Sequence, residues 1–117
     1  MRSIILGMLM AAGATVAAAQ DIGGRYEVRG KNINGSEYGG TVEITATSEN
    51  TCRIVWNVGS TSSGICMRNQ NAFSAAYELG GKIGLIIYEI MADGSMIGIW
   101  TIADQPGVGF ENLYPAR

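Results

Sequence analysis

The sequence offers few side chains that could perform acid–base or nucleophilic chemistry. None of its 117 residues is a histidine, which removes the commonest general base near neutral pH and the usual partner of a serine nucleophile. It holds no phosphate-binding loop, zinc-ligand spacing or dinucleotide fingerprint. Its ten acidic residues could include a glycosidase-like pair, but four occupy positions where strand alternation predicts a solvated face: Glu27, Glu43, Glu78 and Glu89. We therefore predict that the protein is not an enzyme and uses no cofactor.

Two cysteines, Cys52 and Cys66, are the remaining residues with specific chemistry. A metal site would lack partners, because there is no histidine, whereas an exported chain forms disulfides by default. If the strands on either side of Gly59 pair about that glycine, Cys52 stands directly opposite Cys66. Opposed residues in a non-hydrogen-bonded pair have the Cβ separation that a disulfide needs. We predict a structural disulfide that closes a loop of about 15 residues and contributes roughly 3 kcal/mol.

The first 19 residues have the pattern of a secretory signal peptide. Arg2 precedes a mainly apolar run at positions 4–10, and Ala17 and Ala19 are small residues before a cut at Gln20. The run is shorter than the roughly 20 residues of a spanning helix, and no later segment has that length. We expect residues 1–19 to be removed, residues 20–117 to form one β domain, and the mature protein to be periplasmic or secreted.

The charge distribution argues against a nucleic-acid partner. The formal net charge is −2 at pH 7, and the eight basic residues are scattered along the chain. A nucleic-acid-binding protein would gather them into a stripe or patch.

The mature sequence reads as short β-rich runs separated by turn residues, which is the pattern of an all-β protein. We expect antiparallel strands at 24–30, 38–47, 52–58, 63–68, 72–78, 83–91, 96–103 and 108–114. The pairs Asn34-Gly35 and Asp93-Gly94 supply the positive φ values of tight hairpins. Because every connection is short, the eight strands should form a meander that closes into a small up-and-down barrel. A two-sheet β-sandwich is the alternative.

An internal repeat relates two of the expected hairpins. Tyr26-Glu27-Val28, followed by Asn34-Gly35-Ser36, recurs as Tyr88-Glu89-Ile90, followed by Asp93-Gly94-Ser95. In the first hairpin, Tyr26 and Val28 alternate with charged residues and must face inward. The repeat then places Tyr88 and Ile90 inside and leaves an apolar outer face on hairpin 83–103.

That outer face is the predicted partner surface. We assign to it Leu85, Ile87, Met91, Met96, Trp100 and Ile102. An apolar patch of this kind usually marks an interaction site, so we expect it to bind a protein or glycan partner or a second copy of the chain. A different register is the competing account, in which Trp100 plugs the barrel and Tyr88 faces out. The aromatic residues otherwise suit core packing or a barrel mouth that binds an apolar or sugar-like ligand.

Several motifs together resemble a family of small exported proteins of alphaproteobacteria, and the resemblance covers nearly all of the mature chain. They are Gly24-x-Tyr26-x-Val28-x-Gly30, Asn34-Gly35-Ser36-x-Tyr38-x-Gly40, Val55-Trp56-x-Val58-Gly59, Asp93-Gly94-x-x-x-Gly98-x-Trp100 and Gly109-x-Glu111-x-Leu113-x-Pro115. Members are mostly uncharacterised, and some carry the label fibronectin-binding protein. The family implies no catalytic residues, and the Cys52–Cys66 pair departs from its pattern.

These observations favour an exported, non-catalytic binding module that recognises a protein or glycan through a β-surface. An adhesive, fibronectin-binding-like role is one form of this function. Two other functions stay open. One is a periplasmic inhibitor of a hydrolase, similar to the lysozyme inhibitors, and the other is a barrel that binds a small ligand.

Overall fold

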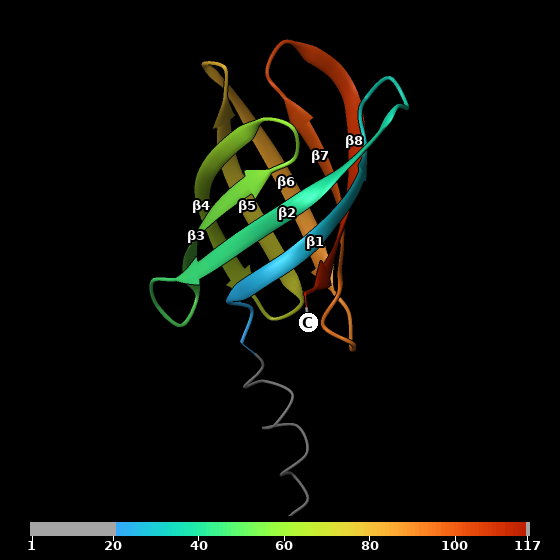
Figure 1. Ribbon diagram of the computed structural model, residues 1–117. Coiled ribbons are helices and arrows are strands. Elements are labelled where there is room, and N and C mark those ends of the chain that lie inside the picture. The colour runs from blue at the N-terminus through green and yellow to red at the C-terminus, as the bar shows by residue number, and fades with distance from the viewer. Residues whose placement is uncertain (1–20, 117) are drawn as a thin grey trace, which may run out of the picture.

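The computed structural model describes residues 21–116, which form a closed barrel of eight strands (Figure 1). The predicted signal peptide at residues 1–19 lies outside the described residues. The strands are β1 (Gly24–Lys31), β2 (Glu37–Ala46), β3 (Thr51–Asn57), β4 (Thr61–Asn69), β5 (Ala72–Leu79), β6 (Lys82–Ile90), β7 (Met96–Ile102) and β8 (Gln105–Pro115). No helix among the described residues is long and apolar enough to cross a membrane.

Each strand pairs antiparallel with its successor, and β1 also pairs with β8. Every predicted strand overlaps one observed strand, and the predicted meander barrel is confirmed; the two sheets of a sandwich are not formed. The turns follow the local sequence, since Gly35, Gly59 and Gly94 have φ values of 92°, 93° and 89°. Closure leaves no strand edge unpaired, which protects so small a β domain from edge-to-edge association.

The end of the barrel at which β1 begins is filled by side chains. Ile22 packs into this end, and its carbonyl accepts a hydrogen bond of 2.7 Å from the Tyr26 hydroxyl. Phe73 stacks on Tyr88 with ring centroids 5.7 Å apart. The fully buried side chains here also include Ile54, Met96 and Leu113.

The predicted disulfide is confirmed. Cys52 lies opposite Cys66 in the β3–β4 register, and a bond joins them with their Cα atoms 4.9 Å apart. Both residues are buried in the core. The pairing follows from the short turn at Gly59, which fixes the register of the whole hairpin.

The predicted outer face of hairpin 83–103 is half wrong. Leu85 and Ile87 point outward and Met91 is 37% exposed, as expected. The other three residues face the interior: Met96 is 0% exposed, Ile102 is 8% exposed, and Trp100 is partly buried against the core.

The physical reason for this error is the turn. Five residues, 91–95, separate β6 from β7, so Ile90 pairs with Met96 and Ile86 with Trp100. Paired residues share a face of the sheet. Even-numbered residues of both strands therefore point inward, whereas the prediction had given the two strands opposite parity. Tyr88 is buried as expected, so Trp100 and Tyr88 both face the interior.

Candidate ligand-binding cavity

A cavity of about 510 Å³ occupies the other end of the barrel, between the β1–β2, β3–β4 and β7–β8 connections. We call it the turn cavity. Four aromatic residues line it: Tyr38, Trp56, Tyr77 and Trp100. Aliphatic residues contribute Val58, Leu79, Ile86 and Ile102, and polar ones include Asn32, Asn34, Ser60, Ser62, Gln105 and Glu111. The barrel thus has a packed end and a hollow end.

Glycines on neighbouring strands keep the turn cavity open. The Tyr38, Tyr77 and Trp100 rings lie across the glycines paired with them, which are Gly30, Gly84 and Gly109. A Cβ on Gly84 would stand 2.1 Å from Cζ of Tyr77, and one on Gly109 would stand 2.2 Å from Cε2 of Trp100. Each ring therefore rests against the barrel wall and does not fill the space around the axis.

The same arrangement positions a buried carboxylate, Glu111, which is 4% exposed. In the sheet register, Tyr38, Gly30, Glu111, Gly98 and Tyr88 form one row across five strands. The two tyrosine rings cross the glycines from either side and reach the carboxylate between them.

Three donors hold Glu111 in place. The Tyr38 hydroxyl donates to Oε1 at 2.6 Å, the Trp56 indole N–H donates to Oε2 at 2.8 Å, and the Tyr88 hydroxyl also donates to Oε2. An indole N–H can only donate, so Oε2 accepts the bond from Trp56. Oε1 accepts the bond from Tyr38. A carboxylate has about four lone-pair sites, and one on Oε1 remains unused by these bonds.

The four aromatic residues of the turn cavity form two contacting pairs. Tyr38 and Trp100 meet edge to face with centroids 6.4 Å apart, and Trp56 and Tyr77 are tilted at 5.2 Å. The Trp100 indole N–H is buried and finds no hydrogen-bond partner among residues 21–116. A buried donor without a partner is costly, so Trp100 is a site of local instability in the wall of the cavity.

Burial raises the pKa of four tyrosines above the ordinary value of 10.0: Tyr26, Tyr38, Tyr77 and Tyr88. For the last three, the negative charge of Glu111 raises the pKa further, because ionising the phenol would place a second negative charge nearby. The pKa of Tyr77 rises to about 12.

Stability is expected to fall at alkaline pH for this reason. An unfolded chain ionises its tyrosines near pH 10, while the folded chain keeps these four protonated. Above about pH 10 the folded state then binds more protons than the unfolded state. The contribution of these tyrosines to the free energy of unfolding is therefore constant below about pH 10 and decreases above it. Urea unfolding at pH 8, 9, 10 and 11 measures this, and Tyr77→Phe should make the loss shallower. Equal stability at pH 9 and 11 would contradict the assignment.

Sequence reasoning missed Glu111 as a site residue. Val108 and Phe110 alternate with Glu111, and the apolar set of a strand ordinarily faces the core. The structure has the reverse, with Phe110 52% exposed. The available indication was the pair of glycines, Gly30 and Gly98, that flank Glu111 on both neighbouring strands, and that register exists only once the barrel closes.

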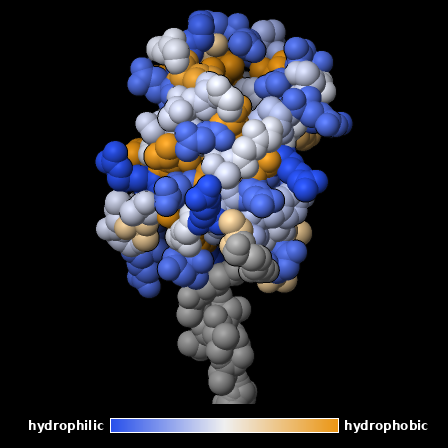
Figure 2. Space-filling model, viewed as in Figure 1, coloured by the Kyte–Doolittle hydropathy of each residue, from blue (hydrophilic) through white to orange (hydrophobic). Residues whose placement is uncertain are grey.

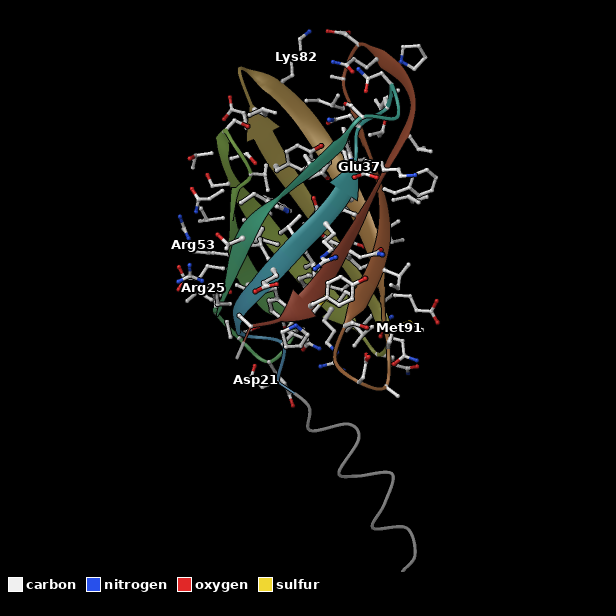
Figure 3. The ribbon with its side chains drawn as sticks, turned by 45° about the vertical axis from the view of Figure 1, so that its right-hand side comes forward. Asp21, Arg25, Glu37, Arg53, Lys82 and Met91 are labelled. Carbon is white, nitrogen blue, oxygen red and sulfur yellow. A yellow bond between two sulfur atoms is a disulfide. The ribbon has the colours of Figure 1, made fainter. Side chains whose placement is uncertain are left out.

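The exterior is divided into two halves. On β1 to β3 the outward residues are largely charged or polar, and hydrophilic residues are spread over the face that β1 and β2 present (Figure 2). Arg25 and Arg53 project from this half (Figure 3). On β4 to β8 many outward residues are apolar, and seven of them form what we call the outer apolar face: Ile65, Met67, Leu85, Ile87, Ile99, Val108 and Phe110.

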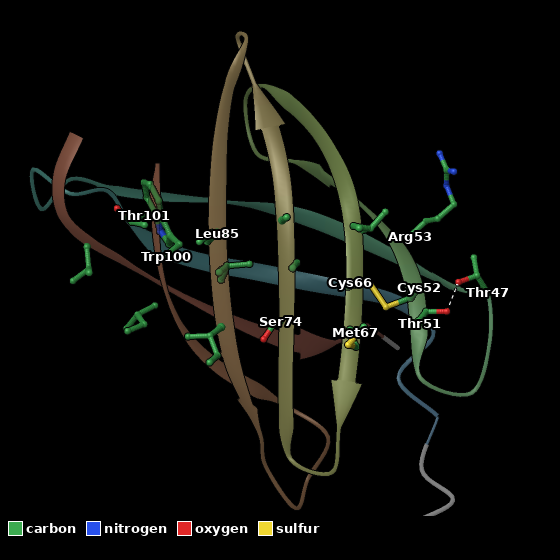
Figure 4. A pocket seen from close by; sticks show the side chains of 17 residues that line it. Thr47, Thr51, Cys52, Arg53, Cys66, Met67, Ser74, Leu85, Trp100 and Thr101 are labelled. Atoms are coloured by element: carbon green, nitrogen blue, oxygen red, sulfur yellow. Dashed lines mark hydrogen bonds between the residues drawn. A yellow bond between two sulfur atoms is a disulfide. The ribbon is translucent and has the colours of Figure 1, made fainter. Parts of the chain in front are cut away.

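A shallow groove of about 770 Å³ runs along the outer apolar face. Met67, Ser74 and Leu85 lie along it on the neighbouring strands β4, β5 and β6 (Figure 4). The register aligns Met67, Ser74, Ile87, Ile99 and Phe110 in one row across five strands. Leu85 and Ile87, both predicted as surface residues, belong to this face, whereas Trp100 and Ile102 line the turn cavity.

Comparison with known proteins supports the fold alone. No protein-family model matches the sequence, and no curated protein matches it. A redesigned β-barrel is similar with a TM-score of 0.73 and 13% identity, over 82% of this chain and 92% of that one. A de novo designed fluorescence-activating β-barrel is similar with a TM-score of 0.66 and 18% identity, over 86% of this chain and 98% of that one. Both similarities agree with the β-barrel fold of this chain.

Proposed function

We propose that this chain is an exported, non-catalytic barrel that binds a small, mainly apolar organic molecule in the turn cavity. One observation carries the proposal: the end of the barrel between the turns is hollow and lined by aromatic rings around a fixed carboxylate. Ligand sites have this composition, apolar walls with a few placed polar groups, and volumes of roughly 300–1,000 Å³. Eight strands enclose enough space for one small ligand.

Export is part of the proposal. The first 19 residues have the pattern of a cleaved secretory segment, and the Cys52–Cys66 disulfide suits an oxidising compartment. A periplasmic or secreted barrel would meet its ligand outside the cytoplasm.

A second candidate function is self-association through the outer apolar face. Ile87 and Phe110 are each 52% exposed, and no charged residue interrupts the row that joins them across the sheet. A partner must offer an equally apolar surface, and the same face of a second copy does so. The adhesive and inhibitory roles predicted from the sequence stay predictions, for which this face is the available contact surface.

Matched substitutions on one strand test the first function. Ser62 lines the turn cavity and Ser63 points outward from β4. Ser62→Trp should fill the cavity and weaken binding of the neutral dye N-phenyl-1-naphthylamine at least ten-fold, measured by fluorescence titration. Ser63→Trp adds the same side chain outside and should leave affinity within two-fold. Equal affinity of the wild-type and Ser62→Trp proteins would exclude the cavity as the site.

The same titration distinguishes the second function when solution mass is measured beside it. Changing Ile87 and Ile99 to lysine together should convert a dimer to a monomer without changing dye affinity. Two lysines at Thr41 and Thr45, on the polar half, are the matched control and should leave the mass unchanged. Dye binding that is lost with the Ile87 and Ile99 substitutions would place the ligand in the outer groove.

A further inference from the structure

The turn cavity contains a carboxylate, Glu111, that forms no ion pair with a basic side chain of the described residues. Glu111 is held by two phenols and one indole, which donate hydrogen bonds but carry no positive charge. No lysine or arginine lines the cavity. Lys82 stands at the same end of the barrel, but it is exposed and paired with Asp104 at 2.7 Å. Arg68 lies near the end of β4, at the packed end of the barrel.

The charged residues around the cavity add a net charge of only −1, because Glu37 faces Lys31 and Asp104 pairs with Lys82. The strand ends and turns around the cavity carry three acidic residues and two basic ones, which are Glu37, Glu78, Asp104, Lys31 and Lys82. A cleft of one sign between low-dielectric walls raises the local concentration of ligands of the opposite sign.

The walls also suit a cation. Tyr38 and Trp100 come from β2 and β7, while Trp56 and Tyr77 come from β3 and β5, so the two pairs line different arcs of the barrel. The face of an aromatic ring is negative and attracts an organic cation, most strongly when both are shielded from water. Several rings arranged around one space are the arrangement that recognises alkylated ammonium groups.

We propose that the ligand of the turn cavity is an organic cation, an ammonium group carried on a small apolar body. This inference rests on the proposed function and adds the charge of the ligand to it. The apolar body occupies the space beside Ile86 and Ile102, and the cationic group lies among the rings near Oε1 of Glu111, whose fourth acceptor site is free. An anion would meet the carboxylate and no compensating charge.

A pair of probes of equal shape tests the charge directly on the unaltered mature protein. Phenyltrimethylammonium and tert-butylbenzene differ only in nitrogen with its positive charge in place of carbon. Calorimetric titration, or displacement of bound N-phenyl-1-naphthylamine, should show the cation binding at least ten-fold more tightly. If both bind and the neutral probe is equal or tighter, the cation proposal is overturned while ligand binding in the cavity stands. If neither the probes nor the dye bind, the proposed function also fails.

Variants assign the preference to the site. Glu111→Gln keeps the shape of the side chain and removes its charge, so the ratio of cation to neutral affinity should fall to about two or less. Tyr77→Leu removes one ring and leaves the charge, so it should lower that ratio several-fold, and this variant serves also if Glu111→Gln does not fold. A cation preference unchanged in every folded variant would place the cation elsewhere and overturn the proposal.

Discussion

Replacing Glu111 by leucine is expected to lower the free energy of unfolding by about 3 kcal/mol or more. Leucine fills a similar volume but leaves the Tyr38 and Tyr88 hydroxyls and the Trp56 indole N–H without their acceptor. Each buried donor without a partner costs about 1–3 kcal/mol. These donors come from three strands and Glu111 from a fourth. The substitution therefore removes hydrogen bonds that link four strands of the barrel. Urea unfolding of the wild-type and Glu111→Leu proteins measures it.

A triple variant tests whether the unpaired donors cause the loss of stability. Adding Tyr38→Phe and Tyr88→Phe to Glu111→Leu removes two of the three donors as well as the acceptor. A set of matched apolar residues can be as stable as a buried polar group or more so, so the triple variant should regain much of the lost stability. A Glu111→Leu protein as stable as the wild type would show that the carboxylate does not organise this end of the barrel.

Removing the disulfide is expected to have the second-largest effect. Changing Cys52 and Cys66 together to alanine should lower the free energy of unfolding by about 3 kcal/mol, because the bond restricts the unfolded chain across 14 residues. A small domain has about 5–15 kcal/mol in total, so the unfolding midpoint should fall clearly. Urea unfolding compares the double variant with the wild type.

The control for this prediction uses the wild-type chain. Thiol titration of the unfolded, unreduced protein should find no free thiol, and reduction should bring its stability down to that of the double variant. Two free thiols per chain would show that the disulfide is absent. A double variant whose free energy of unfolding lies within about 0.5 kcal/mol of that of the oxidised protein would show that the disulfide does not stabilise the fold.

The two ends of the barrel differ in how they are filled. The core around Phe73, Tyr88 and the disulfide fills the end near the N-terminus, while the turn cavity occupies the other. Glu111 lies on the boundary, since it lines the cavity and is held by Tyr88 from the packed core. Under the proposed function, substitutions at Glu111 should therefore change stability and ligand preference together, whereas substitutions at Ser62, on the cavity wall, should change mainly the latter.

The eight strands, their antiparallel order and the disulfide can all be predicted from the amino-acid sequence. Alternation with a period of two and glycine-containing turns are local features, so each hairpin could be inferred from a short stretch of chain. The opposition of Cys52 and Cys66 follows from one turn at Gly59. Closure into a barrel also followed, because short connections bring successive strands side by side.

The residues that form the candidate site can be identified only in the folded barrel. Trp100 and Ile102 were expected outside and lie inside, because the five-residue turn fixes the parity of β7 against β6. Glu111 was hidden by the apolar alternation of Val108 and Phe110. Its inward position depends on glycines of β1 and β7, strands distant in sequence from each other, which leave room for a carboxylate and two crossing tyrosine rings. No local sequence pattern indicates this space, because it forms only where β8 pairs with both β7 and β1.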